Sequence, residues 1–130
     1  MTSSPVMSRF RDQQIPERLR TELELHDDTV VVVAAGEIDL ESANGLREQL
    51  SDLLRGCRAL VLDLREVVFI DSSGLHCILE IADGSAAAGV EFALVRGPRP
   101  VQRLFELTRT DGVLRFVDPG VALDVPRPPE

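Results

Sequence analysis

The sequence predicts a single α/β domain in which a mixed central β-sheet has amphipathic helices packed on it. The prediction depends first on a change of period along the chain, because strand-like apolar segments alternate with segments of helical spacing. It depends also on size and composition. The chain has 130 residues, of which 44% are hydrophobic and 28% charged, as in one domain with its own core.

The first two strands are predicted to form a hairpin. Leu23 and Leu25 alternate with polar residues, which is typical of a strand with one exposed face. Residues 30–35 are all valine or alanine and indicate a buried strand that ends at Gly36. The Asp-Asp-Thr step at residues 27–29 favours a turn between them.

Three helices are predicted from apolar residues that recur every three or four positions. Asp39 is a suitable N-cap for the first helix, and Gly56 is expected to end it. The apolar positions are Leu40, Ala43, Leu46, Leu50 and Leu53 in the first helix, Leu75, Ile78, Leu79 and Ala82 in the second, and Val101, Leu104, Phe105 and Thr108 in the third.

Further apolar runs predict the rest of the sheet. Residues 59–64 are apolar on both faces apart from Asp63, as expected of a central strand that is covered on both sides. A second apolar run follows at residues 67–70. Residues 90–95 indicate another strand, and residues 114–117 a last, short one.

The two ends of the chain differ in composition from its middle. Residues 1–20 have little periodicity and predict a mobile N-terminal arm. Residues 118–130 contain four of the eight prolines and predict a proline-rich C-terminal tail. The folded domain is therefore expected to span residues 21–117.

Charge and hydropathy exclude several classes of protein. The 14 basic residues, all arginine, face 22 acidic ones, and the net charge of −8 argues against a nucleic-acid partner. The longest apolar run has six residues, too few to span a membrane, and the N-terminus lacks the apolar stretch of a secretory signal. We therefore expect a cytoplasmic protein with no membrane partner, and the small size and strong charge favour a monomer.

The segment Asp71-Ser72-Ser73-Gly74-Leu75 is the most informative part of the sequence. It places two hydroxyls between a buried apolar run and an amphipathic helix. The first amides of a helix lack partners within it and carry partial positive charge, so a phosphate added there would meet favourable groups. The alternative is structural, with one serine as the N-cap and the other facing solvent.

Enzyme and metal chemistry find little support in the sequence. Ser72 and His76 are four residues apart, but the serine is not in a nucleophile elbow and no third group orients the pair. His26, His76, Cys57 and Cys77 lack the spacing of metal ligands. The two cysteines are expected at opposite ends of the central strand, too far apart for a disulfide within the chain.

The order of elements and residues 68–75 (VFIDSSGL) resemble the STAS family, and more narrowly its bacterial anti-sigma factor antagonists. Two further segments match the family: residues 36–39 (GEID), which lead into the first helix, and residues 60–64, which form the central strand. The resemblance covers about residues 21–117. It implies a regulatory protein with no enzymatic activity and no cofactor.

The resemblance also implies a switch. In such antagonists the serine directly after the motif aspartate, here Ser72, is phosphorylated by an anti-sigma factor that is also a serine kinase; Ser73 is the second choice. The unphosphorylated form binds that kinase and frees a sigma factor, and a PP2C-type phosphatase restores the serine. The expected partner-binding residues are Glu37, Asp39, Asp71, Ser72, Ser73, Gly74 and His76, with Asp39 close to the serine in space.

Two other interpretations remain open. Some members of the family that the chain resembles act without phosphorylation, as regulatory subunits of membrane transporters or sensory complexes. Such a subunit would not need the hydroxyls of Ser72 and Ser73. A redox-gated antagonist would use Cys57 or Cys77 between two chains. The chain departs from the family pattern after Asp118, where prolines predict that the last helix is shortened or missing.

Overall fold

A computed structural model describes residues 18–118 of the chain. The predicted proline-rich tail beyond Asp118, and with it the shortened last helix, lies outside the described residues, as does the predicted arm up to residue 17. The arm was predicted to extend to residue 20, but Leu19 already begins the first strand and is fully buried.

A five-stranded sheet organises the described residues, and its strands lie side by side in chain order. The first pair is antiparallel and the remaining pairs are parallel, so the predicted mixed sheet is confirmed. The strands are β1 (Leu19–His26), β2 (Thr29–Ile38), β3 (Ala59–Ile70), β4 (Glu91–Val95) and β5 (Phe116–Val117).

The predicted hairpin forms, but β1 begins earlier than the leucine pattern indicated. Its buried side chains are Leu19 and Thr21, whereas Leu25 is 67% exposed. The Thr21 hydroxyl donates a hydrogen bond to Oε1 of Gln49 in the first helix, 3.1 Å away. The helix therefore covers the beginning of β1, and Leu25 lies beyond this cover.

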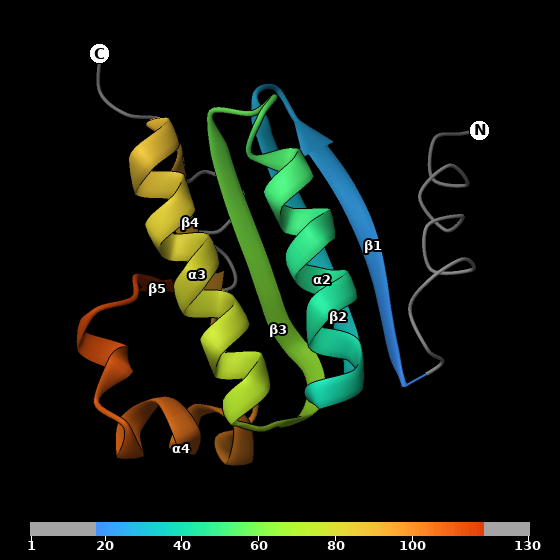
Figure 1. The fold of residues 1–130 in the computed structure, drawn as a ribbon, viewed down its shortest axis with the longest axis vertical. Coiled ribbons are helices and arrows are strands. Elements are labelled where there is room, and N and C mark those ends of the chain that lie inside the picture. The colour runs from blue at the N-terminus through green and yellow to red at the C-terminus, as the bar shows by residue number, and fades with distance from the viewer. Residues whose placement is uncertain (1–17, 119–130) are drawn as a thin grey trace.

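Three α-helices follow in the predicted order: α2 (Leu40–Leu53), α3 (Ser72–Ala88) and α4 (Arg99–Leu107). In Figure 1, α2 and α3 run side by side across one face of the sheet. The N-cap at Asp39 is confirmed, but Gly56 does not end α2 as predicted, since Leu54 is its C-cap with a right-handed backbone. The left-handed glycine cap belongs instead to Gly89, at the end of α3.

The central strand is longer than its apolar pattern indicated. The runs at 59–64 and 67–70 belong to one strand, β3, which pairs with β4 only over Ala59 to Asp63. Asp63, the polar exception, is buried, and its carboxylate accepts a hydrogen bond of 2.8 Å from Nη2 of Arg65. This partner compensates for burying the charge.

The hydrophobic core lies between the sheet and the helices. Side chains of α2, α3 and α4 pack on the sheet face that they cover, with Leu46, Ile78 and Phe105 fully buried. A smaller cluster on strand residues only is formed by Val31, Val61 and Val95. Burial of this apolar surface is the main contribution to the stability of the fold.

Gly36 brings the start of β1 against the end of β2. Its φ of 118° favours glycine, and a Cβ at this position would overlap the carbonyl oxygen of Arg18. The same oxygen accepts a hydrogen bond of 2.7 Å from the amide of Glu37. The glycine thereby places Arg18 beside the carboxyl end of β2.

Candidate functional site

The candidate site lies where two neighbouring parallel strands end and two helices begin. Ile38 and Ile70, the last residues of β2 and β3, are register partners, and the amide of Asp71 donates to the Ile38 carbonyl at 3.3 Å. Each isoleucine is followed by an aspartate. The expected proximity of Asp39 to the Asp71–Ser72 step is thus explained by the register of the sheet.

At α3, the aspartate and not a serine is the N-cap. The Oδ1 atom of Asp71 accepts hydrogen bonds from the amides of Ser73, at 2.9 Å, and Gly74, at 3.2 Å. The alternative in which one of the serines caps the helix is therefore wrong. Ser72 is the first helical residue and is exposed, whereas Ser73 is half-buried.

Gly74 has a structural reason that the sequence pattern did not show. It is buried, and a Cβ on it would lie 2.7 Å from both the Ile38 carbonyl oxygen and Ile38 Cγ2, and 2.8 Å from Ile70 Cγ1. These distances are shorter than van der Waals contact allows. Gly74 lets the first turn of α3 rest directly on the two strand ends and so fixes the position of Ser72.

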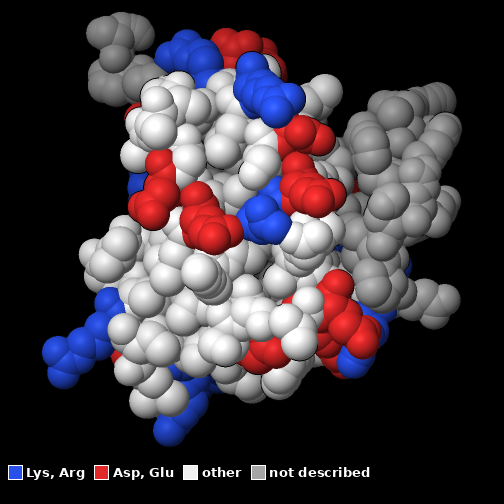
Figure 2. Space-filling model, in the orientation of Figure 1, with Lys and Arg blue, Asp and Glu red and all other residues white. Residues whose placement is uncertain are grey.

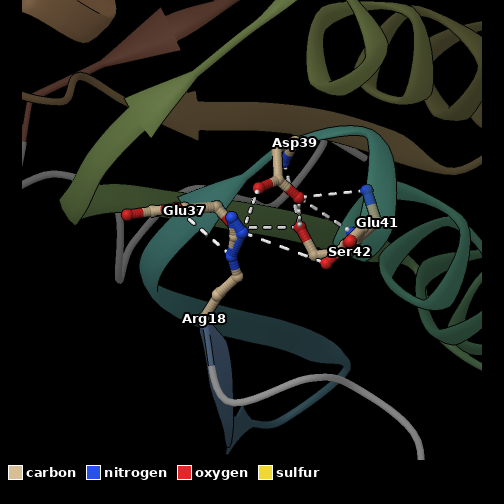
Figure 3. Close-up of polar contacts among 5 residues, drawn as sticks. All are labelled: Arg18, Glu37, Asp39, Glu41 and Ser42. Atoms are coloured by element: carbon tan, nitrogen blue, oxygen red, sulfur yellow. Dashed lines mark hydrogen bonds and ion pairs between the residues drawn. The ribbon is translucent and has the colours of Figure 1, made fainter.

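Asp39 is held by a capping box and by a cation (Figure 3). Its Oδ1 accepts from the amides of Glu41 and Ser42, both at 3.1 Å, while the Ser42 hydroxyl accepts from the amide of Asp39. The Nη1 atom of Arg18 lies 3.3 Å from Asp39 Oδ2. Arg18 also lies within 4 Å of carboxylate oxygens of Glu37 and Glu41.

These contacts set the charge state of Asp39. Burial by itself would raise the pKa of this carboxyl, but the hydrogen bonds from Ser42 and Glu41 and the charge of Arg18 outweigh it, so the pKa is lowered. Asp39 is therefore a carboxylate at neutral pH. The role of Arg18 was missed, because only the tertiary contact across the hairpin brings it to this edge.

An open groove of about 980 Å³ runs between α2 and α3 and begins at the two serines. Its basic side chains are Arg47 and His76. In the groove, Arg47 Nε lies 3.5 Å from Glu80 Oε1, and His76 Nε2 lies 3.6 Å from Glu80 Oε2. Arg47 also donates to the side-chain oxygen of Asn44.

Exposed apolar side chains lie at the start of α2 and at the end of β3, the strand that leads to the serine. Leu40 is 76% exposed, Val68 65% and Phe69 48%. Leu40 belongs to the apolar period predicted for the first helix, but as the first residue of α2 it is exposed while Ala43, Leu46 and Leu50 are buried. In Figure 2, the lower end of the molecule, where α2 and α3 begin, has uncharged surface with acidic side chains at the lower right and basic ones at the lower left. Such a patch favours contact with another protein.

Among the described residues, Ser72 is not paired with a base, and no set of metal ligands gathers near it. His76 contacts Glu80, and within residues 18–118 no hydrogen bond joins it to Ser72. No group of three or more possible metal-ligating side chains gathers in that part of the chain. None of the described helices is long and apolar enough to cross a membrane.

Both cysteines are free thiols. Cys77 is buried under the groove, and burial raises the pKa of its thiol to about 12. Burial also raises the pKa of the half-buried Cys57. Because the thiolate is the reactive form, neither environment favours redox chemistry near neutral pH.

The fold and this site define a class of domain that comparison with known proteins identifies. The model of the STAS domain family matches residues 20–121, which is most of the chain. The chain belongs to the STAS domain family.

Its relatives include anti-sigma factor antagonists. The chain is 33% identical over 102 residues to the anti-sigma F factor antagonist of Paenibacillus polymyxa, covering 77% of this chain and 87% of the relative. It is similar to the crystal structure of an anti-sigma factor antagonist from Mycobacterium paratuberculosis, with 29% identity, a TM-score of 0.71 and coverage of 82% and 90% of the two chains.

A third comparison shows the fold alone. The anti-sigma factor antagonist SpoIIAA in its unphosphorylated form has a TM-score of 0.69 at 20% identity, with coverage of 80% of this chain and 93% of SpoIIAA. The predicted membership of the STAS family is confirmed by the family match and the relatives together.

Proposed function

We propose that this protein is an anti-sigma factor antagonist switched by phosphorylation of Ser72. In the unphosphorylated state it binds an anti-sigma factor that is also a serine kinase, and the bound sigma factor is released. The kinase then phosphorylates Ser72, and the antagonist dissociates. It acts as a binding protein without catalysis of its own, in the cytoplasm.

The observation that carries this proposal is the placement of Ser72. It is exposed, it is the first residue of α3, and Asp71 and Gly74 hold that helix end on the strand ends. A kinase can reach such a hydroxyl without unfolding the domain. Ser73, half-buried beside it, is the second choice as acceptor.

The surroundings of Ser72 support a protein partner. Leu40 and Phe69 expose apolar area at the same edge, and the acidic group of Glu37, Asp39 and Asp71 lies along it. An apolar patch with a polar rim is the usual composition of a protein interface. Glu37, Ser72, Ser73 and His76 supply the accessible polar contacts that we propose, whereas the buried Gly74 acts through the position of α3.

Phosphorylation would change this surface sharply. A phosphoserine carries about −1.5 to −2 charges at pH 7. It would lie near two carboxyl groups, that of Asp71 and that of Asp39, whose pKa is lowered. The added charge and bulk would have to be desolvated inside an apolar contact. A coupling of about 1–3 kcal/mol between phosphate and partner lowers the affinity by about 5- to 150-fold.

The test uses four forms of the full chain as bait in a lysate of its own bacterium: wild type, Ser72→Ala, Ser72→Glu and Ser51→Glu. Ser51 is an exposed serine in α2, far along that helix from the site, so its variant adds the same charge elsewhere. We expect wild type, Ser72→Ala and Ser51→Glu to retain an ATP-binding anti-sigma factor and Ser72→Glu to lose it.

The same experiment identifies the acceptor and the alternatives. Wild-type bait with Mg-ATP should gain one phosphate, which peptide mass spectrometry assigns to Ser72 or Ser73. Equal capture by all four baits would contradict the switch, and a transporter ATPase or sensory protein in that common set would favour an unphosphorylated regulatory subunit instead. Size-exclusion chromatography with light scattering tests the proposed monomer of 14.3 kDa.

The reset step needs a second protein. We propose that a PP2C-type phosphatase removes the phosphate from the exposed end of α3. Phosphorylated protein incubated with lysate should lose its phosphate when Mn²⁺ is present and keep it in EDTA, because this class of phosphatase depends on bound divalent cations. Loss of phosphate in EDTA would point to a different class.

A further inference from the structure

We propose that, once Ser72 is phosphorylated, the His76 side chain forms an ion pair with the phosphate of phosphoserine 72. In doing so it gives up its contact with Glu80. The inference rests on the proposed function only in taking Ser72 as the acceptor. It concerns what the phosphate contacts within this chain after it has been added.

Ser72, His76 and Glu80 lie in a row along one side of α3. They are spaced four residues apart, so they follow one another on the same helix face, and all three line the groove. In the unphosphorylated protein His76 Nε2 lies 3.6 Å from Glu80 Oε2. The histidine therefore already contacts an anion one turn after it, and Ser72 is one turn before it in the helix.

Two of the backbone donors next to Ser72 are already used, and the donors that stay open there are uncharged: the Ser72 amide, the Ser73 hydroxyl and the Asn44 side-chain amide. The amides of Ser73 and Gly74, which face the end of α3, donate to Asp71 Oδ1. Of the basic side chains that line the groove, Arg47 contacts Glu80 two turns further along. His76 is thus the basic group one helical turn from Ser72 that can turn toward a new anion.

The direction of the helix favours the exchange. An anion four residues before a cation is a better pair than the reverse order, because it agrees with the helix dipole. Phosphoserine 72 with His76 has the favourable order, whereas His76 with Glu80 has the unfavourable one. Phosphate also carries more charge than the glutamate.

The remaining charged groups of the groove fit the same exchange. Glu80 and Asp83 come from α3, and Arg47 comes from α2. When His76 turns to the phosphate, Glu80 keeps its second basic partner, Arg47, whose Nε lies 3.5 Å from Glu80 Oε1. A positive charge on His76 beside the phosphate favours the dianionic form of the phosphate, which makes the contact dependent on pH.

The test is a phosphorus NMR titration of the full chain with phosphoserine incorporated at position 72 during translation, so that no kinase is required. The second ionisation of phosphoserine lies near pH 6. With His76 present we expect its midpoint about half a pH unit lower than in the His76→Gln variant. The difference should shrink in 1 M salt, because His76 and residue 72 are both exposed to solvent.

The other histidine provides the matched control. His26, at the end of β1, is paired with Glu24, and His26→Gln should leave the midpoint unchanged. Equal midpoints in wild type and His76→Gln would overturn the proposal, as would an equal shift from His26→Gln. Failure of the bait experiment with a positive titration would remove the proposed kinase partner and leave the His76 contact standing.

Discussion

Ile38 and Ile70 are register partners at the carboxyl ends of β2 and β3, and each is followed by an aspartate that caps a helix. The two helices therefore start side by side at the same edge of the sheet. This pairing brings the GEID segment and the DSSGL segment, which are over thirty residues apart in the chain, into one surface. The surface exists because parallel strands end together.

The close contact of α3 with the strand ends predicts a large difference between two glycines of the same helix. Gly74→Ala should destabilise the domain by about 1–3 kcal/mol, because its Cβ would meet Ile38 and Ile70 within 2.8 Å. Gly84→Ala should be neutral or stabilising by up to about 1 kcal/mol, since its Cβ would lie 3.4 Å from Leu54 Cδ1 and alanine favours helix. Urea unfolding measures both, and similar losses would contradict the contact.

The lowered pKa of Asp39 predicts a stability that depends on pH. A carboxyl whose folded pKa is below its unfolded value of 3.8 stabilises the fold above that value and loses the contribution as the pH falls through the folded pKa. Asp39→Ala should cost about 1–2 kcal/mol at pH 7, and the difference from wild type should shrink below pH 3.8.

The control for Asp39 is an exposed carboxylate at the other end of the same helix. Asp52→Ala should change the free energy of unfolding by less than about 0.5 kcal/mol at either pH. Denaturant unfolding of the three proteins at pH 7 and pH 3 tests this. A constant Asp39→Ala deficit at both pH values would show that the charge of Asp39 adds nothing to its role as a cap.

The exposed leucine at the site predicts a loss of binding without a loss of stability. Leu40→Ser should leave the free energy of unfolding within about 0.5 kcal/mol of wild type, because the side chain is 76% exposed. It should weaken capture of the partner by at least about tenfold if Leu40 lies inside the interface. Leu107→Ser in α4, where the leucine is 68% exposed, should leave capture unchanged. Equal effects of both variants would place the interface elsewhere.

The two thiols predict slow and unequal alkylation. In native protein at pH 8, Cys57 should react with iodoacetamide more slowly than free cysteine, because burial raises the pKa of its thiol. Cys77 should stay unmodified until the protein unfolds, since its thiol has a pKa of about 12. Mass spectrometry of labelled peptides distinguishes the sites. Rapid labelling of Cys77, or a disulfide-linked dimer under mild oxidant, would restore the redox-gated alternative.

Much of the fold follows from patterns that are local in the chain. The apolar period predicted three helices, the valine run predicted a buried strand, and Asp39 and the DSSGL motif marked two helix starts. These are short-range effects, because the spacing of apolar side chains and the hydrogen bond of a cap depend on a few neighbouring residues. The exact ends were less predictable: β1 begins at Leu19, and β3 continues through Arg65 and Glu66 to Ile70.

The composition of the site required contacts between distant segments. No local pattern shows that Leu40 is exposed, that Gly74 rests on Ile38, or that Arg18 reaches Asp39 across the hairpin. These relationships come from the register of β2 with β3 and from the packing of helices on the sheet, which bring together residues far apart in the chain. The serine itself is visible in the sequence, whereas its exposure, its capping aspartate and the groove beside it come from long-range packing.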